Sequence, residues 1–349
     1  MIILLFIVTL AVLILAHEFG HFLFAKLSNT KVEEFGLGLP PRIFGIKKGE
    51  TLYSLNWIPF GGFVKILGEN DSVKGEPRSF SSKPAHIRAI ILVAGVVFNV
   101  VLAFLLLSAV NVVGAPASVG PEITDADVTI VSIQQDSPAQ NAGLLPGDRI
   151  KQMTSAGETL EIKTIESVQD FVSRHNGQFV EIDYLRGKEV LNTRIMPDPL
   201  LGIAMDRIGI VSYPVHKAIW YGLRDTGYLT VAITKMFGVL IADIFAGGDL
   251  VGQIRGPVGI VEMVGTTAGL GLVYVLQFMA LLSINLAILN MIPFPALDGG
   301  RLLILGIEKI KGSPINQNFM KHAYSISFLI LILLMLLVTY RDVARLFME

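Results

Sequence analysis

The chain contains no cysteine. Disulfide bonds, a cysteine nucleophile and thiolate metal sites are therefore excluded, so any metal here needs His, Asp or Glu ligands. Charge is also scarce. Charged residues make up 16% of the 349 positions and hydrophobic residues 52%, whereas soluble globular chains carry about 25% charged residues. This composition excludes a disordered chain and argues against an ordinary soluble enzyme. The net charge of −1 gives no basic excess for nucleic-acid binding.

Four segments contain no Asp, Glu, Lys or Arg: residues 1–16, 89–121, 263–297 and 323–340. A bilayer core about 30 Å thick takes about 20 helical residues, so the last three runs are long enough to span it. The first reaches that length only when it continues past its polar insertion to residue 25. We therefore predict a polytopic α-helical membrane protein with four transmembrane helices, at residues 1–25, 89–113, 270–297 and 323–342.

The first of these helices has an alternative interpretation as a cleaved signal peptide. It fits poorly, because no basic residue precedes the apolar run and no small-x-small cleavage site follows it.

The segments between the helices differ in charge. Residues 26–88 hold ten Lys/Arg against six Asp/Glu, and residues 299–322 hold four against one, whereas residues 122–225 hold ten against fifteen. The positive-inside rule places the two basic segments (26–88 and the 298–322 loop and helix) on the cytoplasmic side and the acidic one outside. Four spans with both termini outside satisfy this distribution.

Residues 214–262 complicate the count. A fifth span is an alternative at residues 229–246, but Lys235 and Asp243 interrupt it, and a charge at the bilayer centre is costly. We therefore expect this segment to be amphipathic and to lie at the outer membrane surface.

Residues 122–200 are expected to form a small extracytoplasmic domain with an α+β fold. Alternating patterns predict strands at residues 128–132, 179–184 and 190–195. The run Ser137–Ile150, SPAQNAGLLPGDRI, resembles PDZ domains of bacterial proteases. Such domains bind a peptide as an added strand. The alternative is a β-rich spacer that binds nothing.

Residues 26–88 contain a second β pattern. Thr51–Ile58 alternates, and Pro59–Gly62 separates it from the apolar run Phe63–Leu67. This predicts a β-hairpin too apolar to sit wholly in water. Non-helical backbone at membrane depth is tolerated only where it lines protein or a cavity. We therefore predict a re-entrant hairpin near the cytoplasmic face; an ordinary cytoplasmic loop is the alternative.

The most specific motif is HExxH, at His17-Glu18-Phe19-Gly20-His21. On a helix, positions i and i+4 share a face about 6 Å apart along the axis. Two imidazoles so placed can hold one zinc, with Glu18 as general base. Burying these side chains in an apolar helix is costly unless function or pairing offsets it. The alternative is a polar cluster that satisfies itself between helices.

A catalytic zinc usually has three protein ligands and one open position. The remaining four histidines lie in interhelical or outer segments, at His86, His175, His216 and His322. Asp298 ends a long uncharged run in which two prolines break the helix. From the residues alone, Asp298 is either the third ligand or the N-cap of a helix beginning near Gly300.

Together these features resemble the site-2 protease family of intramembrane zinc metalloproteases, in particular the bacterial regulator of sigma-E protease group. The family pairs HExxH with an NxxPxPxLDGG motif, which stands here at Asn290–Gly300. Further matching segments are Gly36–Gly38, Ile58–Lys65, Ala94–Asn99, Ser137–Ile150 and Gly256–Ile260. Two departures are Val96, where the family has proline, and a single PDZ unit where many relatives have two.

The resemblance implies a site with one base and three ligands. His17, His21 and Asp298 would bind Zn²⁺, and Glu18 would be the catalytic base. Two further positions are implied to bind substrate, Asn290 and Pro293. A fifth span would separate His17 from Asp298 by most of the bilayer, which also favours four.

The resemblance further implies a zinc metalloendopeptidase (EC 3.4.24) acting in regulated intramembrane proteolysis. Its substrates would be single-span membrane proteins, such as anti-sigma factors or signal-peptide remnants, and the PDZ domain would contact the substrate or its trimmed terminus. The expected location is the bacterial inner (plasma) membrane, with the PDZ domain extracytoplasmic and the active site towards the cytoplasm.

Two rival functions remain. A membrane adaptor with a structural metal would keep its function without Glu18. A zinc transporter would need polar residues along several helices at different depths, whereas the sequence offers one compact constellation.

Overall fold

The computed structural model describes residues 2–69, 76–120, 126–187, 189–246, 256–313 and 315–346. The chain divides into two compact units. The first, called the helical unit below, comprises Met1–Ala109 and Ile219–Glu349, and the second, the sheet unit, comprises Val110–Ala218. Parts of five predicted segments lie outside the described residues: positions 1, 70–75, 122–125 with 188, 247–255, and 314.

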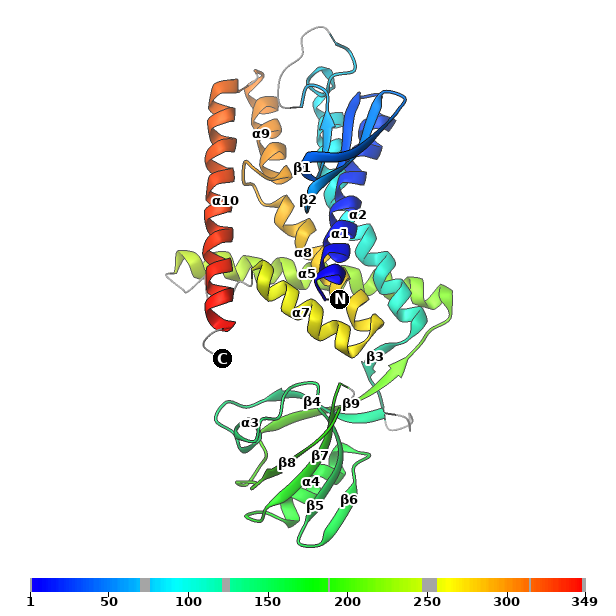
Figure 1. Ribbon diagram of the computed structural model, residues 1–349, viewed down its shortest axis with the longest axis vertical. Coiled ribbons are helices and arrows are strands. Elements are labelled where there is room, and N and C mark those ends of the chain that lie inside the picture. Colours follow the sequence, from blue (N-terminus) through cyan, green and yellow to red (C-terminus); the bar gives the residue numbers. More distant parts are fainter. Residues whose placement is uncertain are drawn as a thin grey trace. The chain divides into compact units, whose positions relative to one another are not determined.

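The helical unit is built on long apolar helices (Figure 1). The helices are α1 (Ile2–Leu27), α2 (Ala85–Val113), α5 (Val215–Phe245), α7 (Pro257–Leu270), α8 (Leu272–Met291), α9 (Asp298–Lys311) and α10 (Gln317–Leu346), with a 3-10 turn at Phe80–Ser82. Among the described residues, five are long and apolar enough to cross a membrane, by length and composition. Four of them overlap the predicted spans, and α8 ends at Met291, before the predicted end of the third span at residue 297.

The fifth candidate, Val215–Asp243, is the least apolar of the set and covers the segment expected to lie on the membrane surface. Figure 1 shows α5 running across the direction of α1 and α10. On the buried side of α5, Ile233 belongs to one apolar cluster with Leu107 of α2 and Ile284 of α8. The four-span arrangement therefore stays a prediction, and the structure adds one further helix of sufficient length.

Two long bent strands follow α1. β1 (Val32–Lys48) and β2 (Thr51–Ile66) pair antiparallel around the turn at Gly49. Leu37 is registered with both Leu55 and Gly62, so the start of β1 lies between the first and last parts of β2. Within the described residues, the 62–66 segment of β2 has strand partners only in β1. Its other edge is therefore free.

The sheet unit holds a seven-stranded sheet in the order β3-β9-β4-β5-β7-β8, with β6 paired to β5. Its elements are β3 (Ala115–Ser118), β4 (Ala126–Ile133), α3 (Pro138–Asn141), β5 (Arg149–Ser155), β6 (Glu158–Glu161), α4 (Ile165–Arg174), β7 (Val180–Arg186), β8 (Glu189–Ile195) and β9 (Ile203–Val211). The three predicted strands lie within or largely within β4, β7 and β8.

One apolar core organises this unit. Phe171 of α4 is fully buried among the inward side chains of the sheet, including Ile150, Met153 and Ile182. The alternating burial of β5 and β7 explains this arrangement, because successive strand residues point to opposite faces.

Candidate metal centre

Two glycines let α1 and α2 approach closely. A Cβ on Gly20 would lie 2.4 Å from the carbonyl oxygen of Ala94, and a Cβ on Gly95 would lie 2.4 Å from Nε2 of His21. Real side chains essentially never tolerate such distances. Glycine at both positions is therefore what allows the histidine-bearing face of α1 to pack directly on α2.

His17 and His21 share that face, as their spacing predicts. Both are buried, with relative exposures of 8% and 9%. Their Nε2 atoms lie 3.1 Å apart. Nδ1 of His21 lies 2.8 Å from the carbonyl oxygen of Ile91. Because a carbonyl only accepts, Nδ1 carries the proton, which leaves the lone pair of Nε2 facing His17.

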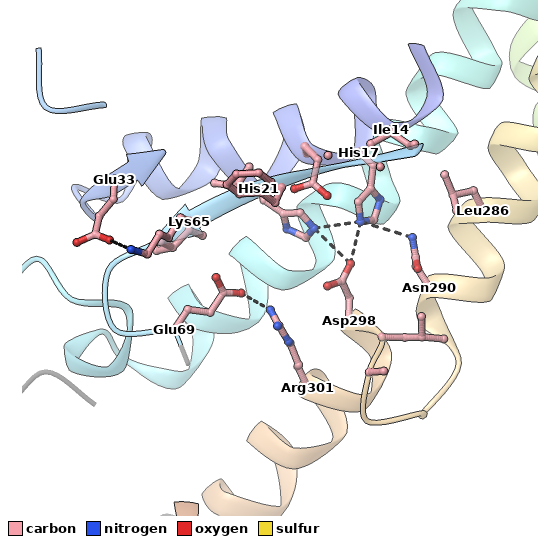
Figure 2. A pocket seen from close by; sticks show the side chains of 18 of the residues that line it. Ile14, His17, His21, Glu33, Lys65, Glu69, Leu286, Asn290, Asp298 and Arg301 are labelled. Atoms are coloured by element: carbon pink, nitrogen blue, oxygen red, sulfur yellow. Dashed lines mark hydrogen bonds and ion pairs between the residues drawn. The ribbon is translucent and has the colours of Figure 1, made fainter. Parts of the chain in front are cut away.

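Asp298 completes the cluster from α9. Its Oδ2 lies 3.0 Å from Nε2 of His17 and 3.2 Å from Nε2 of His21 (Figure 2). Among the described residues this is the one group of three or more His, Cys, Asp or Glu side chains close enough to hold a metal ion. Ligands about 2.0–2.1 Å from a tetrahedral zinc lie about 3.3 Å from one another. The three atoms therefore fit a zinc ion. A zinc ion would also give a partner to the buried Oδ2 of Asp298, which receives no hydrogen bond.

The alternative role of Asp298 as a helix cap has less support. α9 begins at Asp298 itself, its N-cap position is Leu297, and no side chain caps the helix there. The carboxylate points to the imidazoles instead (Figure 2).

Glu18 lines the same cavity, of about 700 Å³, as the two histidines and Asp298. The strand β2 passes beside it. A Cβ on Gly62 would lie 2.7 Å from Ile14 and 3.3 Å from Cγ of Glu18. The absence of a side chain at Gly62 thus lets the free edge of β2 run past the carboxylate.

Of the two predicted substrate-binding residues, one lines the cavity in the structure and the other does not. Asn290, near the end of α8, lines the cavity, and its Nδ2 lies 3.5 Å from Nε2 of His17. Pro293 is exposed in the loop between α8 and α9 and is not among the residues lining this cavity. The four other histidines lie outside the cluster; His175, for example, is buried in the sheet unit beside Phe171.

The structure adds an ion pair that the sequence interpretation missed. Arg301 and Glu69 form a salt bridge at the wall of the cavity (Figure 2). Arg301 follows Asp298 by three positions on α9, which places both on one face of the helix. That spacing was the available signal for Arg301; nothing in the sequence pointed to Glu69, because it reaches the site only through the course of β2.

The site combines three side chains that could hold one metal ion with a carboxylate in the same cavity, on helices apolar enough to cross a membrane, and these are the features of a membrane metallohydrolase. Residues 5–334 match peptidase family M50. A candidate zinc metalloprotease of Clostridium perfringens is 35% identical over 333 residues, which cover 95% of each chain. The zinc metalloprotease RasP of Shouchella clausii and the regulator of sigma-W protease RasP of Bacillus subtilis are 28% identical over 428 and 426 residues, with 98% of each chain covered.

The chain belongs to peptidase family M50, the site-2 protease family, and is a zinc-dependent metalloprotease. Its several apolar helices agree with the membrane location of that family.

Proposed function

We propose that this chain is an intramembrane endopeptidase that cleaves the transmembrane segment of single-span membrane proteins, with anti-sigma factors and signal-peptide remnants as the substrate class. One observation carries the proposal. The proposed ligands His17 and His21 and the proposed base Glu18 lie on α1, a helix long and apolar enough to cross a membrane. A peptide bond that reaches this cavity is therefore one that is already in or at the bilayer.

The proposed chemistry assigns one role to each side chain. His17, His21 and Asp298 would hold a zinc ion, which would supply Lewis-acid chemistry: polarisation of the scissile carbonyl and a lowering of the pKa of a water molecule towards about 7. Glu18 takes a proton from the attacking water and delivers it to the leaving amine. Asn290, whose amide points towards the ligand cluster, donates a hydrogen bond to the substrate carbonyl oxygen.

A substrate helix hides its peptide bonds in its own hydrogen bonds, so it has to unwind before attack. The free edge of β2 at residues 62–66 supports a way to hold the unwound segment, because these residues line the cavity that contains Glu18. An extended peptide can add to such an edge through main-chain hydrogen bonds. Gly62 keeps that edge clear of side-chain bulk.

The sheet unit is proposed to be a single PDZ domain that binds or sterically filters the trimmed end of the substrate. Its fold and the run from Ser137 support this assignment. Ser137 caps α3 by accepting from the backbone N–H of Gln140. Asp148, buried at the end of the run, accepts from the N–H of Leu145 and from Arg186.

The proposed location is the bacterial inner membrane, with the sheet unit outside and the β1–β2 turn towards the cytoplasm. Single cysteines test this directly, because the natural chain has none. Ser173→Cys on α4 and Lys48→Cys at the end of β1 are both exposed positions. An impermeant maleimide added to intact spheroplasts should label the first and not the second until the membrane is opened. Equal labelling of both would refute the orientation.

The decisive experiment concerns Glu18. Glu18→Gln keeps the three ligands, so zinc content should stay at one per chain while cleavage of a single-span substrate falls by at least about 10²–10⁴-fold. The matched control is Glu161→Gln in the sheet unit, an exposed carboxylate whose loss should change neither quantity. Near-normal turnover in Glu18→Gln would favour the adaptor alternative with a structural metal.

A further inference from the structure

A polar residue of α2, Asn99, contacts the proposed metal centre. Asn99 is fully buried, with a relative exposure of 0%. Its Nδ2 lies 3.2 Å from Nδ1 of His17, the ring nitrogen that faces away from Asp298 and His21. Its Oδ1 is buried and has no hydrogen-bond partner.

The two ends of an Asn amide are assigned from the surrounding hydrogen bonds, because oxygen and nitrogen have nearly the same shape. If Nδ2 donated to His17, Nδ1 would be the acceptor, and the proton of the neutral imidazole would sit on Nε2. Nε2 is the atom that points at Asp298 and His21, and a protonated nitrogen cannot bind zinc. Turning the amide by half a revolution removes the conflict and gives the orphaned oxygen a donor.

We propose that Asn99 is a positioning residue: its side-chain oxygen accepts the Nδ1 proton of His17 and thereby holds the Nε2 lone pair towards the zinc ligand cluster. Metal-binding histidines generally donate their second ring N–H to a carbonyl or carboxylate, and loss of that partner typically weakens metal affinity by about 10–100-fold. Asn99 supplies such a partner from within a helix of low polarity.

The two histidines are then oriented by the same helix in two different ways. His21 is held by the main-chain oxygen of Ile91, which no substitution removes. His17 depends on the side chain of Asn99 two turns further along α2. A second buried hydrogen bond ends on Asn99 without involving its side chain, because Ser283 of α8 donates to the main-chain oxygen of Asn99 at 2.7 Å.

The test measures zinc affinity by chelator competition on the detergent-solubilised full chain, so it does not depend on cleavage or on the identity of the substrate. Asn99→Leu keeps the approximate size and loses the acceptor; zinc affinity should fall by about 10–100-fold. Asn99→Asp keeps an acceptor oxygen and should therefore bind zinc more tightly than Asn99→Leu by about the same factor. Ser283→Ala, which removes a buried hydroxyl that touches Asn99 but not His17, is the matched control and should stay within about twofold of the natural chain.

Three outcomes would overturn the proposal. If Asn99→Leu, folded by its thermal transition, binds zinc as tightly as the natural chain, His17 needs no partner. If Asn99→Asp loses affinity as severely as Asn99→Leu, the side chain acts through packing and not as an acceptor. His17→Ala, which removes a proposed ligand, should show the lowest zinc affinity. If that variant binds zinc as tightly as the natural chain, His17 is no ligand, and both the ligand assignment and the role of Asn99 are overturned. If the zinc affinities change as expected but the natural chain cleaves no single-span substrate, the proposed function fails while the role of Asn99 stands.

Discussion

The two units of this chain differ in where their long apolar side chains lie. In the sheet unit, Phe171 and Ile182 are fully buried in one apolar core. In the helical unit, long apolar side chains such as Leu333 lie on the outer surface with relative exposures near 57%, while His17 and Asn99 are inside.

The difference follows from the surroundings of each unit. In water, burial of apolar surface stabilises a fold by about 25 cal/mol per Å². Between helices in lipid that term is absent, and association depends on close packing and on hydrogen bonds. Burying an ionisable side chain between such helices is costly, so a buried cluster of His and Asp there points to function.

The largest expected effect tests the polar interior of the helical unit. Asp298→Asn removes the charge of the third proposed ligand while keeping its shape. Zinc affinity should fall and cleavage should drop by about 10³-fold or more, as for an essential catalytic metal, with the thermal transition of the protein unchanged. Zinc content and turnover of purified protein check this. A helix-capping role predicts the opposite, since Asn caps as well as Asp; full zinc and full activity would move the search for a ligand to His86 and His322.

The next prediction compares a buried apolar side chain of the sheet unit with an exposed one of the helical unit. Phe171→Ala in the sheet unit should destabilise that unit by about 3–5 kcal/mol, because it opens a cavity in a water-driven core. Leu333→Ala on the exposed face of α10 should change stability by less than about 0.5 kcal/mol. Hydrogen exchange of the β5 and β7 amides and thermal unfolding measure the two effects. Equal costs at both positions would show that the outer face of α10 is packed against protein and not lipid.

The smallest expected effect concerns helix packing. Gly95→Ala places a methyl group 2.4 Å from Nε2 of His21, so α1 and α2 must separate; overpacking of this kind costs about 1–3 kcal/mol, and zinc affinity should fall with it. Gly227→Ala on α5, where a Cβ meets nothing within 4 Å, is the matched control and should be neutral or stabilising by about 0.5–1 kcal/mol. Thermal unfolding with zinc titration checks both. A harmless Gly95→Ala would contradict the close approach of the two helices.

Much of the architecture could be predicted from local patterns. Uncharged runs located four long helices, because insertion into lipid depends on the composition of each segment by itself. Alternation located strands of the sheet unit for a similar reason. The long helix at Val215–Phe245 was the difficult case, since Lys235 and Asp243 lower its apolar character without removing it, and composition alone does not decide between a span and a surface helix.

The sequence by itself determined that His17 and His21 share one side of a helix, because helical spacing alone places the two imidazoles on one face. Tertiary structure decided everything that comes from another element. It brought the carboxylate of Asp298 to 3.0 Å from His17, placed Asn99 behind the same ring and carried Glu69 to Arg301. Helix periodicity reaches only a few residues along the chain, whereas the contacts of His17 with Asn99 and Asp298 join α1 to segments some 80 and 280 positions away. Only the packing of the helices defines such contacts.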